Sequence, residues 1–210
     1  INMACPSGMK SVALATQAIQ LGDSKVVVAG GMDSMSTIPY LLKGARWDGF
    51  KMGDKTLLDG WSDSIDPVID TGMGGTAENL VEKFDISREA MDAFAVESHS
   101  KAVAAIEEGR FAKEIVPFVI PATKKSPEVK FEVDETPRRG TSVEKLAKLP
   151  AVFRKGGRVT AGNACGMSDG ATAIILTSRE NAAALGAKPL FSITGFSQTA
   201  VDNATMGEGP

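Results

Sequence analysis

Apolar residues early in the chain recur every three or four positions, the spacing of a helix with one buried face. The residues that share this spacing are Val12, Ala15, Thr16 and Ile19. Ser7 suits the start of such a helix and Gly22 suits its end. A short apolar run at residues 25–29 stops at Gly30 and Gly31, so it is predicted to be a buried strand. A helix followed by a buried strand is typical of an α/β fold.

No period persists from residue 34 to about residue 70. Glycines and prolines interrupt this stretch, and large aromatic residues are scattered through it, namely Tyr40, Trp47, Phe50 and Trp61. We interpret it as an ordered but irregular excursion from the regular structure. The alternative is a flexible linker, which the aromatic content disfavours because linkers seldom carry large apolar side chains.

Regular patterns resume at Thr76, with a helix predicted over 78–83. A stronger helix is predicted from Ser87, which can cap its start, to Gly109, which can end it. The apolar stripe of this helix is Met91, Ala95, Ala102 and Ile106. Strands are predicted at 114–120, 129–133, 171–176 and 190–196, and helices at 143–149 and 178–185.

The composition is that of an ordinary globular protein. The 210 residues are 43% hydrophobic and 23% charged, which is enough to bury a core. A net charge of -3 argues against binding to nucleic acid or to an anionic membrane surface, because such proteins usually carry a basic surplus. No apolar run approaches the roughly 20 residues that span a bilayer. The 2 cysteines give no disulfide framework, which suits a reducing compartment.

Cys5 stands directly before the first predicted helix. Unpaired N–H groups and the positive end of the helix dipole favour a thiolate at such a position, and the thiolate is the nucleophilic form of cysteine. The alternative is a small cysteine that only packs, which is common for free cysteines. Position alone leaves both interpretations open.

Several separated motifs resemble those of one enzyme family. The segment 2–10 (NMACPSGMK) resembles the surroundings of the acyl-accepting cysteine of thiolases, and 28–36 (VAGGMDSMS) resembles the next signature of that family. The segment 159–171 (VTAGNACGMSDGA) resembles a third. Shorter matches at 76–79, 92–95, 109–111 and 114–117 fall in the same order along the chain. The resemblance covers nearly the whole chain.

The thiolase resemblance implies a layered α/β fold with an inserted α+β loop domain. It implies that residues 1–34 and 168–210 are parts of the N-terminal half of the core. It implies that residues 35–167 are the loop domain that covers coenzyme A. The family's Gly-His-Pro segment and its second catalytic cysteine in a Cys-x-Gly segment are not found in these 210 residues. We therefore expect a partial chain that is inactive by itself.

The resemblance also implies an activity, namely acyl transfer between acyl-CoA molecules through a thioester on Cys5. Acetoacetyl-CoA synthesis or thiolysis is the favoured version. Two alternatives remain: a degradative 3-ketoacyl-CoA thiolase of fatty-acid β-oxidation, and a non-catalytic thiolase-like binding or assembly module. Coenzyme A and acyl-CoA are then substrates, and no cofactor and no metal are expected.

Several substrate contacts follow from the resemblance alone. Met73 is expected to form a wall of the acyl pocket, although it suits a plain core position equally well. Phe153 and Ala164 are expected among the substrate contacts. Cys165 stands where the family usually has a serine near the pantetheine arm, so we interpret it as a contact or packing residue and not as the second catalytic cysteine. Gly72 replaces a histidine that is common in biosynthetic members, which predicts a roomier pocket.

Arg138 is implied as the contact to the adenine or phosphate end of coenzyme A. Arginine suits phosphate because its guanidinium donates in a fork, although paired arginines are also common on plain solvated surfaces. The 1 histidine of the chain, His99, has no family motif around it and is interpreted as an ordinary helical residue. The expected assembly is a homodimer or homotetramer in the cytoplasm. Mitochondrial or peroxisomal placement stays open because the sequence begins without an initiator methionine.

Overall fold

The structure is a computed structural model that describes residues 1–47, 49–61, 69 and 71–210. The chain forms two compact units. The first consists of Ile1–Asp63 with Met167–Ala200, and the second of Ser64–Gly166 with Val201–Pro210. The predicted domain boundaries at 34 and 167 remain a prediction, because compactness alone does not reveal which part covers a substrate.

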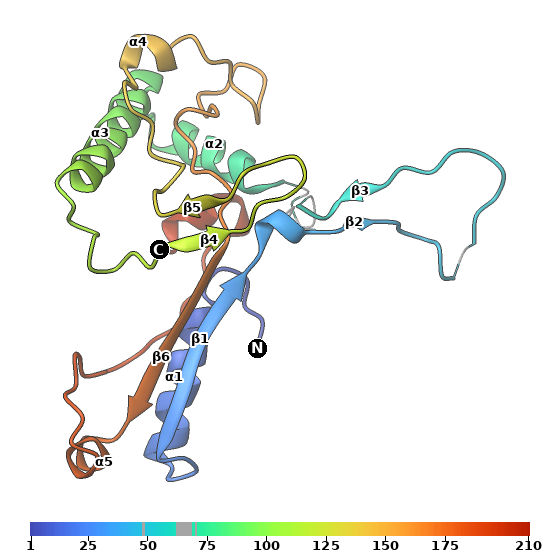
Figure 1. Ribbon diagram of the computed structural model, residues 1–210. Helices are drawn as coiled ribbons and strands as arrows, with labels where there is room; N and C mark the ends of the chain where they lie inside the picture. Colours follow the sequence, from blue (N-terminus) through green and yellow to red (C-terminus); the bar gives the residue numbers. More distant parts are fainter. Residues whose placement is uncertain (48, 62–68, 70) are drawn as a thin grey trace. The chain divides into compact units, whose positions relative to one another are not determined.

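The first unit is built on one helix and a two-stranded antiparallel sheet. Helix α1 (Ser7–Gln20) lies along strand β1 (Val26–Asp33), which pairs with β6 (Gly170–Thr177) (Figure 1). The register pairs Val26 with Thr177 and Asp33 with Gly170. Ala15, Ala29 and Leu176 form the buried centre, with Val12, Ile19 and Val27 packed against it. The predicted helix and both of these strands are therefore confirmed.

The sequence predicted that this strand stops at the double glycine, but strand β1 does not. It continues through Gly30 and Gly31 to Asp33. A Cβ on Gly31 would lie 3.2 Å from the Cα of Gly8 on α1, and one on Gly30 would lie 1.9 Å from the carbonyl oxygen of Thr172 on β6. Gly30 therefore allows a close backbone approach to β6 and Gly31 a close approach to α1, and neither glycine ends the strand.

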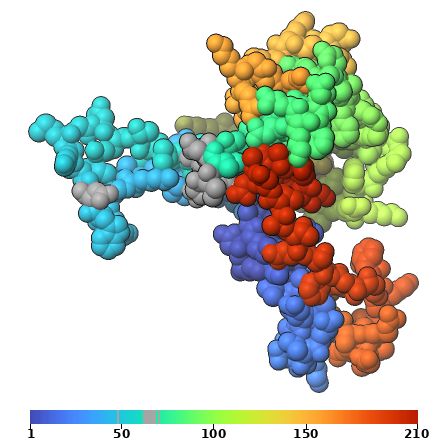
Figure 2. All heavy atoms as spheres, turned by 180° about the vertical axis from the view of Figure 1, so that it is seen from behind, coloured from blue at the N-terminus to red at the C-terminus, as the bar shows by residue number. Residues whose placement is uncertain are grey.

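The stretch from residue 34, predicted to be irregular, carries only short elements where the structure describes it, and the helix predicted at 178–185 is present as α5 (Arg179–Ala184). The short elements of the stretch are the 3-10 helix η1 (Met35–Thr37), strand β2 (Tyr40–Leu41) and strand β3 (Leu58–Asp59). The residues around the β2–β3 ladder form an arm in both views, and Trp47 on it is 90% exposed (Figure 1 and Figure 2). Residues 48, 62–68 and 70 of the predicted irregular stretch lie outside the described residues.

Two helices organise the second unit. Helix α2 (Met73–Lys83) starts before the predicted helix, and α3 (Arg88–Glu107) matches the prediction closely. The Ser87 side chain caps α3 by accepting a hydrogen bond from the N–H of Ala90, as expected, and Gly109 has the positive φ of +67° that suits a helix end. The remaining elements are β4 (Phe118–Ile120), β5 (Val129–Phe131), α4 (Val143–Leu146) and the 3-10 helix η3 (Asn203–Glu208).

Two buried carboxylates tie the segment 146–163 to these helices. Glu78 on α2, only 1% exposed, accepts hydrogen bonds from the backbone N–H of Val159 at 2.7 Å and of Arg158 at 2.9 Å. Asp92 on α3, also 1% exposed, pairs with Arg88 and accepts from the amide of Asn163 at 2.9 Å. Buried charges are tolerated where they are paired or hydrogen-bonded. Both carboxylates are hydrogen-bonded here, and Asp92 is also in an ion pair.

Some predicted elements are shorter than expected or missing. The strand predicted at 114–120 is reduced to β4, and the helix predicted at 143–149 to the four residues of α4. The strand predicted at 190–196 is wrong, since these described residues take no regular structure. An apolar run becomes a strand only beside a partner, and none of the described strands pairs with this run. In the described part of the chain, no helix is long and apolar enough to cross a membrane.

Candidate active site

Cys5 lies in a tight turn that leads into α1. Pro6 is the N-cap of this helix, and the cysteine is exposed. Ala4, directly before it, has a φ of +54°, in the left-handed region that non-glycine residues rarely adopt. Local side chains fasten this turn: the N–H of Ala4 donates to Oδ1 of Asn2 at 3.0 Å, and the N–H of Met3 donates to Oγ of Ser7 at 2.7 Å.

The electrostatics at the start of α1 favour negative charge. The structure describes the whole first turn of this helix, and this turn carries no acidic side chain. The positive end of the helix dipole is therefore not offset locally, and Lys10 adds a further positive charge one turn in. An exposed thiol at this place is chemically suited to act as a nucleophile.

The structure joins two of the family-like motifs inside the first unit. The backbone N–H of Ser36 donates to Oδ1 of Asp169 at 2.9 Å, although these residues are far apart in sequence. This hydrogen bond is the main reason that the pKa of Asp169 lies below its ordinary value, and the Ser36 hydroxyl lowers it further. The pairing of Asp33 with Gly170 brings the same two motifs side by side in the sheet.

Met73 and Phe153 both adjoin Gly74 at the start of α2, in the second unit. Met73 is the first residue of the helix, and the Phe153 ring lies so close to Gly74 that a Cβ there would be 2.2 Å from two ring carbons. Both predicted contacts are about half exposed, at 46% and 51%. Arg154, next to the phenylalanine, is anchored to α2 through hydrogen bonds to the Gly75 carbonyl and the Asn79 side chain.

Ala164 and Cys165 are exposed and follow an anchored turn. The amide of Asn163 donates to Asp92 at 2.9 Å and to the carbonyl of Arg158 at 3.1 Å, while its oxygen accepts from the N–H of Thr160 at 2.7 Å. These contacts fix the backbone immediately before the two predicted substrate contacts. Cys5 belongs to the first unit, and the other five predicted site residues belong to the second.

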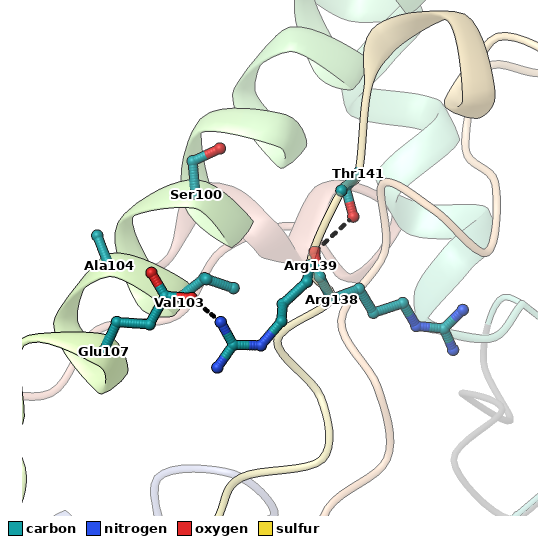
Figure 3. Close-up of a pocket in the computed structure, with 8 residues that line it drawn as sticks. Ser100, Val103, Ala104, Glu107, Arg138, Arg139 and Thr141 are labelled. Carbon is teal, nitrogen blue, oxygen red and sulfur yellow. Dashed lines mark hydrogen bonds and ion pairs between the residues drawn. The ribbon is translucent and has the colours of Figure 1, made fainter.

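Arg138 borders a hollow of about 350 Å³ beside α3 (Figure 3). Its neighbour Arg139 forms an ion pair with Glu107, whereas the Arg138 side chain extends away from that glutamate. The backbone of Arg138 is held on both sides, because its N–H donates to Nδ1 of His99 at 3.3 Å and its carbonyl accepts from the Thr141 hydroxyl at 2.9 Å. His99, to which the sequence assigned no role, therefore fastens the arginine turn.

Residues 1–180 match the family model described as "Thiolase, N-terminal domain". This chain belongs to the thiolase family. Among its relatives, an acetyl-CoA acetyltransferase of Pseudomonas aeruginosa is 49% identical over 212 residues, which cover 100% of this chain and 53% of that protein. The thiolase chain thus spans about half the length of the curated relatives that it matches.

Solved thiolase structures agree with this fold. An acetyl-CoA acetyltransferase from Bacillus anthracis is 46% identical and superposes with a TM-score of 0.91, covering 100% of this chain and 53% of its own. Human mitochondrial 3-ketoacyl-CoA thiolase in complex with CoA is 39% identical with a TM-score of 0.89, covering 100% of this chain and 52% of its own. The predicted α/β fold of a thiolase N-terminal half is confirmed.

The roles of the individual thiolase residues stay predictions. They concern Cys5 as nucleophile and Met73, Arg138, Phe153, Ala164 and Cys165 as substrate contacts. Within the described residues, no cluster of three or more His, Cys, Asp or Glu side chains is arranged to hold a metal ion. Asn2, Gly74 and His99 were not predicted to have a role. Of these, Asn2 carries a local signal, because an asparagine side chain commonly accepts a hydrogen bond from the backbone N–H two residues later, as it does here from Ala4.

Proposed function

We propose that this chain supplies the acyl-accepting cysteine of a thiolase acyltransferase. The observation that carries the proposal is the exposed Cys5 at the positive start of α1, in a chain of the thiolase family. The names of the relatives support acetyl-CoA as a substrate, because the curated protein from Pseudomonas aeruginosa is an acetyl-CoA acetyltransferase. Coenzyme A and acyl-CoA are substrates in this proposal, and no further cofactor is invoked.

The proposed chemistry begins with the Cys5 thiolate. Its Sγ attacks the carbonyl carbon of an acyl-CoA thioester, a new C–S bond to Cys5 forms, and the bond to the coenzyme A sulfur breaks. Coenzyme A leaves as a thiolate and takes up a proton. In synthesis, the α-carbon of a second acyl-CoA loses a proton to a base and takes the acyl group as the C–S bond to Cys5 breaks. In thiolysis, Sγ instead attacks the 3-keto carbon of a 3-ketoacyl-CoA, the bond from that carbon to the α-carbon breaks, and the α-carbon takes up a proton to leave as acetyl-CoA. The acyl group on Cys5 then passes to the sulfur of free coenzyme A, which loses its proton. Either route restores the free cysteine.

The remaining site residues are proposed as the binding surface of coenzyme A. Met73 and Phe153 present half-exposed apolar surface at the start of α2, which suits an acyl or pantetheine group. Arg138 presents a guanidinium beside an open hollow, which suits phosphate oxygens. Ala164 and Cys165 stand exposed on an anchored loop, which suits contact with the pantetheine arm.

Acyl-enzyme formation tests the nucleophile directly. The intact protein is mixed with acetyl-CoA, digested and analysed by mass spectrometry for an acetyl group on the Cys5 peptide. We expect acetylation of Cys5 in the wild type, none in Cys5→Ala, and retained acetylation in Cys165→Ser, which removes the other thiol. Acetylation at Cys165 instead of Cys5, or no acetylation in the wild type, would overturn the proposal.

A degradative activity on longer 3-ketoacyl chains is the second candidate. Gly72 is the N-cap of α2 and puts no side chain next to Met73, which supports a wider pocket. A homodimeric or homotetrameric assembly and a cytoplasmic location are also proposed. Light scattering on the intact protein and fractionation of the source cells test these two points.

A further inference from the structure

The hydroxyl of Ser7 bridges the turn that carries Cys5. Its Oγ accepts a hydrogen bond from the N–H of Met3 at 2.7 Å and donates one to the carbonyl oxygen of Ala4 at 2.6 Å. The backbone N–H of Ser7 donates to that same oxygen at 3.1 Å. One side chain therefore connects the backbone before Cys5 to the first residue of α1.

This bridge holds a backbone conformation that is unfavourable by itself. Ala4 has a φ of +54°, in the left-handed region, where the Cβ of a non-glycine residue comes too close to the following carbonyl oxygen. The two polar groups of Ala4 are both engaged, its carbonyl by Ser7 and its N–H by Asn2 at 3.0 Å. Such a conformation persists only where the surroundings over-determine it, and it often occurs beside reacting groups.

We propose that Ser7 is a positioning residue that fixes the placement of the Cys5 thiol. The inference rests on the proposed function, since it needs Cys5 to be the nucleophile. Loss of the hydroxyl leaves the Met3 N–H without its acceptor and removes one of the two hydrogen bonds to the Ala4 carbonyl. Ala4 then relaxes toward negative φ. The peptide between Ala4 and Cys5 then rotates and carries Sγ away from its place at the start of α1. Ser7 touches only the backbone and takes no part in the chemistry.

Acyl transfer is sensitive to this placement because the sulfur must approach the thioester carbon along a defined line. A misplacement of about 1 Å can cost roughly 100-fold in rate. The two hydrogen bonds of the Ser7 hydroxyl both lie within the turn that carries Cys5. The loss should therefore fall on the rate of acylation and not on the affinity for acetyl-CoA.

The experiment compares three variants of the intact protein. Ser7→Ala removes the bridge, and Ser7→Thr keeps a hydroxyl at the same place. Ser11→Ala is the matched control, since the Ser11 hydroxyl lies 2.7 Å from the Gly8 carbonyl and 2.8 Å from that of Gly30, within the same unit but away from the Cys5 turn. Single-turnover acetylation of Cys5 is measured against acetyl-CoA concentration, and alkylation of Cys5 is measured separately with iodoacetamide.

We expect Ser7→Ala to lower the maximal acetylation rate by about 10- to 100-fold while the half-saturating acetyl-CoA concentration changes less than about twofold. Ser7→Thr should restore most of the rate, and Ser11→Ala should acetylate Cys5 like the wild type. If Ser7→Ala acetylates as fast as the wild type, or if Ser7→Thr is as slow as Ser7→Ala, the inference is wrong. Failure of the wild type to acetylate Cys5 would overturn the proposed function instead. In that case, equal iodoacetamide rates in wild type and Ser7→Ala would overturn the role of Ser7 as well.

Discussion

Asp169 accepts a hydrogen bond from the backbone N–H of Ser36 at 2.9 Å and so joins two thiolase signatures that are far apart in the sequence. The pKa of Asp169 is lowered by this bond first and by the Ser36 hydroxyl second. A lowered pKa in the folded state means that folding favours the ionised carboxylate. The resulting stabilisation is present above the unfolded-state pKa of about 3.9 and is lost as the pH falls through the folded value.

The first prediction concerns this pH dependence. Asp169→Asn should lower the melting temperature of the intact protein at pH 7, and the difference from the wild type should shrink as the pH falls below about 4. Ser36→Ala is the control: it keeps the backbone N–H, which is the larger cause, and should retain most of the wild-type pH dependence. Thermal unfolding between pH 3 and pH 7 measures both. A constant difference over that range would show that the charge of Asp169 does not contribute.

The two cysteines provide the second prediction. Both are free and exposed, so accessibility alone predicts similar alkylation rates. Only Cys5 lies at the start of a helix, and we expect iodoacetamide at neutral pH to modify it about tenfold faster than Cys165. Acetyl-CoA should slow the reaction at Cys5. Peptide mass spectrometry over time measures both rates, and equal rates would remove the physical basis for assigning Cys5 as the nucleophile.

The third prediction concerns the close contact between Gly74 and the Phe153 ring. A Cβ on residue 74 would lie 2.2 Å from ring carbons, so Gly74→Ala must displace the ring. Overpacking of this kind costs about 1 to 3 kcal/mol, and the displaced ring should also raise the KM for the CoA substrate. Phe153→Leu in the same chain should return part of the stability, because a smaller side chain accommodates the added methyl group. Additive losses in the double variant would argue against the contact.

The fourth prediction concerns the buried carboxylate of Glu78. This carboxylate accepts from two consecutive backbone N–H groups, of Arg158 and Val159. Glu78→Gln turns an NH2 group toward one of them and should cost about 1 to 3 kcal/mol of unfolding free energy. Glu82 lies on the same helix with a side chain that is 69% exposed and pairs with Arg154, so Glu82→Gln should cost less than about 1 kcal/mol. Denaturant unfolding compares the two, and equal losses would contradict a special role for the buried carboxylate.

Much of this fold could be predicted because the local sequence patterns, namely apolar spacing and helix caps, agree with the packing in the folded chain. The 3.6-residue spacing found α1, and the expected Ser87 cap located the start of α3. The sequence failed where the outcome depends on a distant partner. Gly30 and Gly31 look like a strand end, yet their lack of a side chain is required by Thr172 and Gly8. The run 190–196 looks like a strand, yet no described strand pairs with it.

The candidate site shows the same division. Cys5 could be found from its motif and its place before a helix. Ser7 was expected to suit the helix start, but its side chain reaches backward to Met3 instead of forward into the helix. The Phe153 ring lies against Gly74, and no local pattern in the sequence reports which side chain will cover a glycine.

The fifth prediction concerns the acyl chain length. Gly72 is the N-cap of α2 with φ of −79° and ψ of 175°, an extended conformation that any residue adopts, so Gly72→His adds an imidazole beside Met73 without backbone strain. If this position borders the acyl pocket, the wild type accepts acetoacetyl-CoA and also 3-ketoacyl chains somewhat longer than four carbons. One methylene in an apolar pocket changes discrimination by about 1 to 3 kcal/mol, so the preference should be graded and not absolute.

Steady-state kinetics on the intact protein tests this with a series of 3-ketoacyl-CoA substrates. Gly72→His should shift the ratio of kcat/KM values toward acetoacetyl-CoA by about 10-fold or more per methylene. Gly72→Ala is the matched control, because it removes the glycine without filling the space of an imidazole, and should leave the ratio near that of the wild type. A wild type confined to acetoacetyl-CoA, or an unchanged ratio in Gly72→His, would mean that Gly72 does not shape the pocket. Substrate length would then have to be set by other residues, of which Met73 and Phe153 are the next to vary because they share the same end of α2.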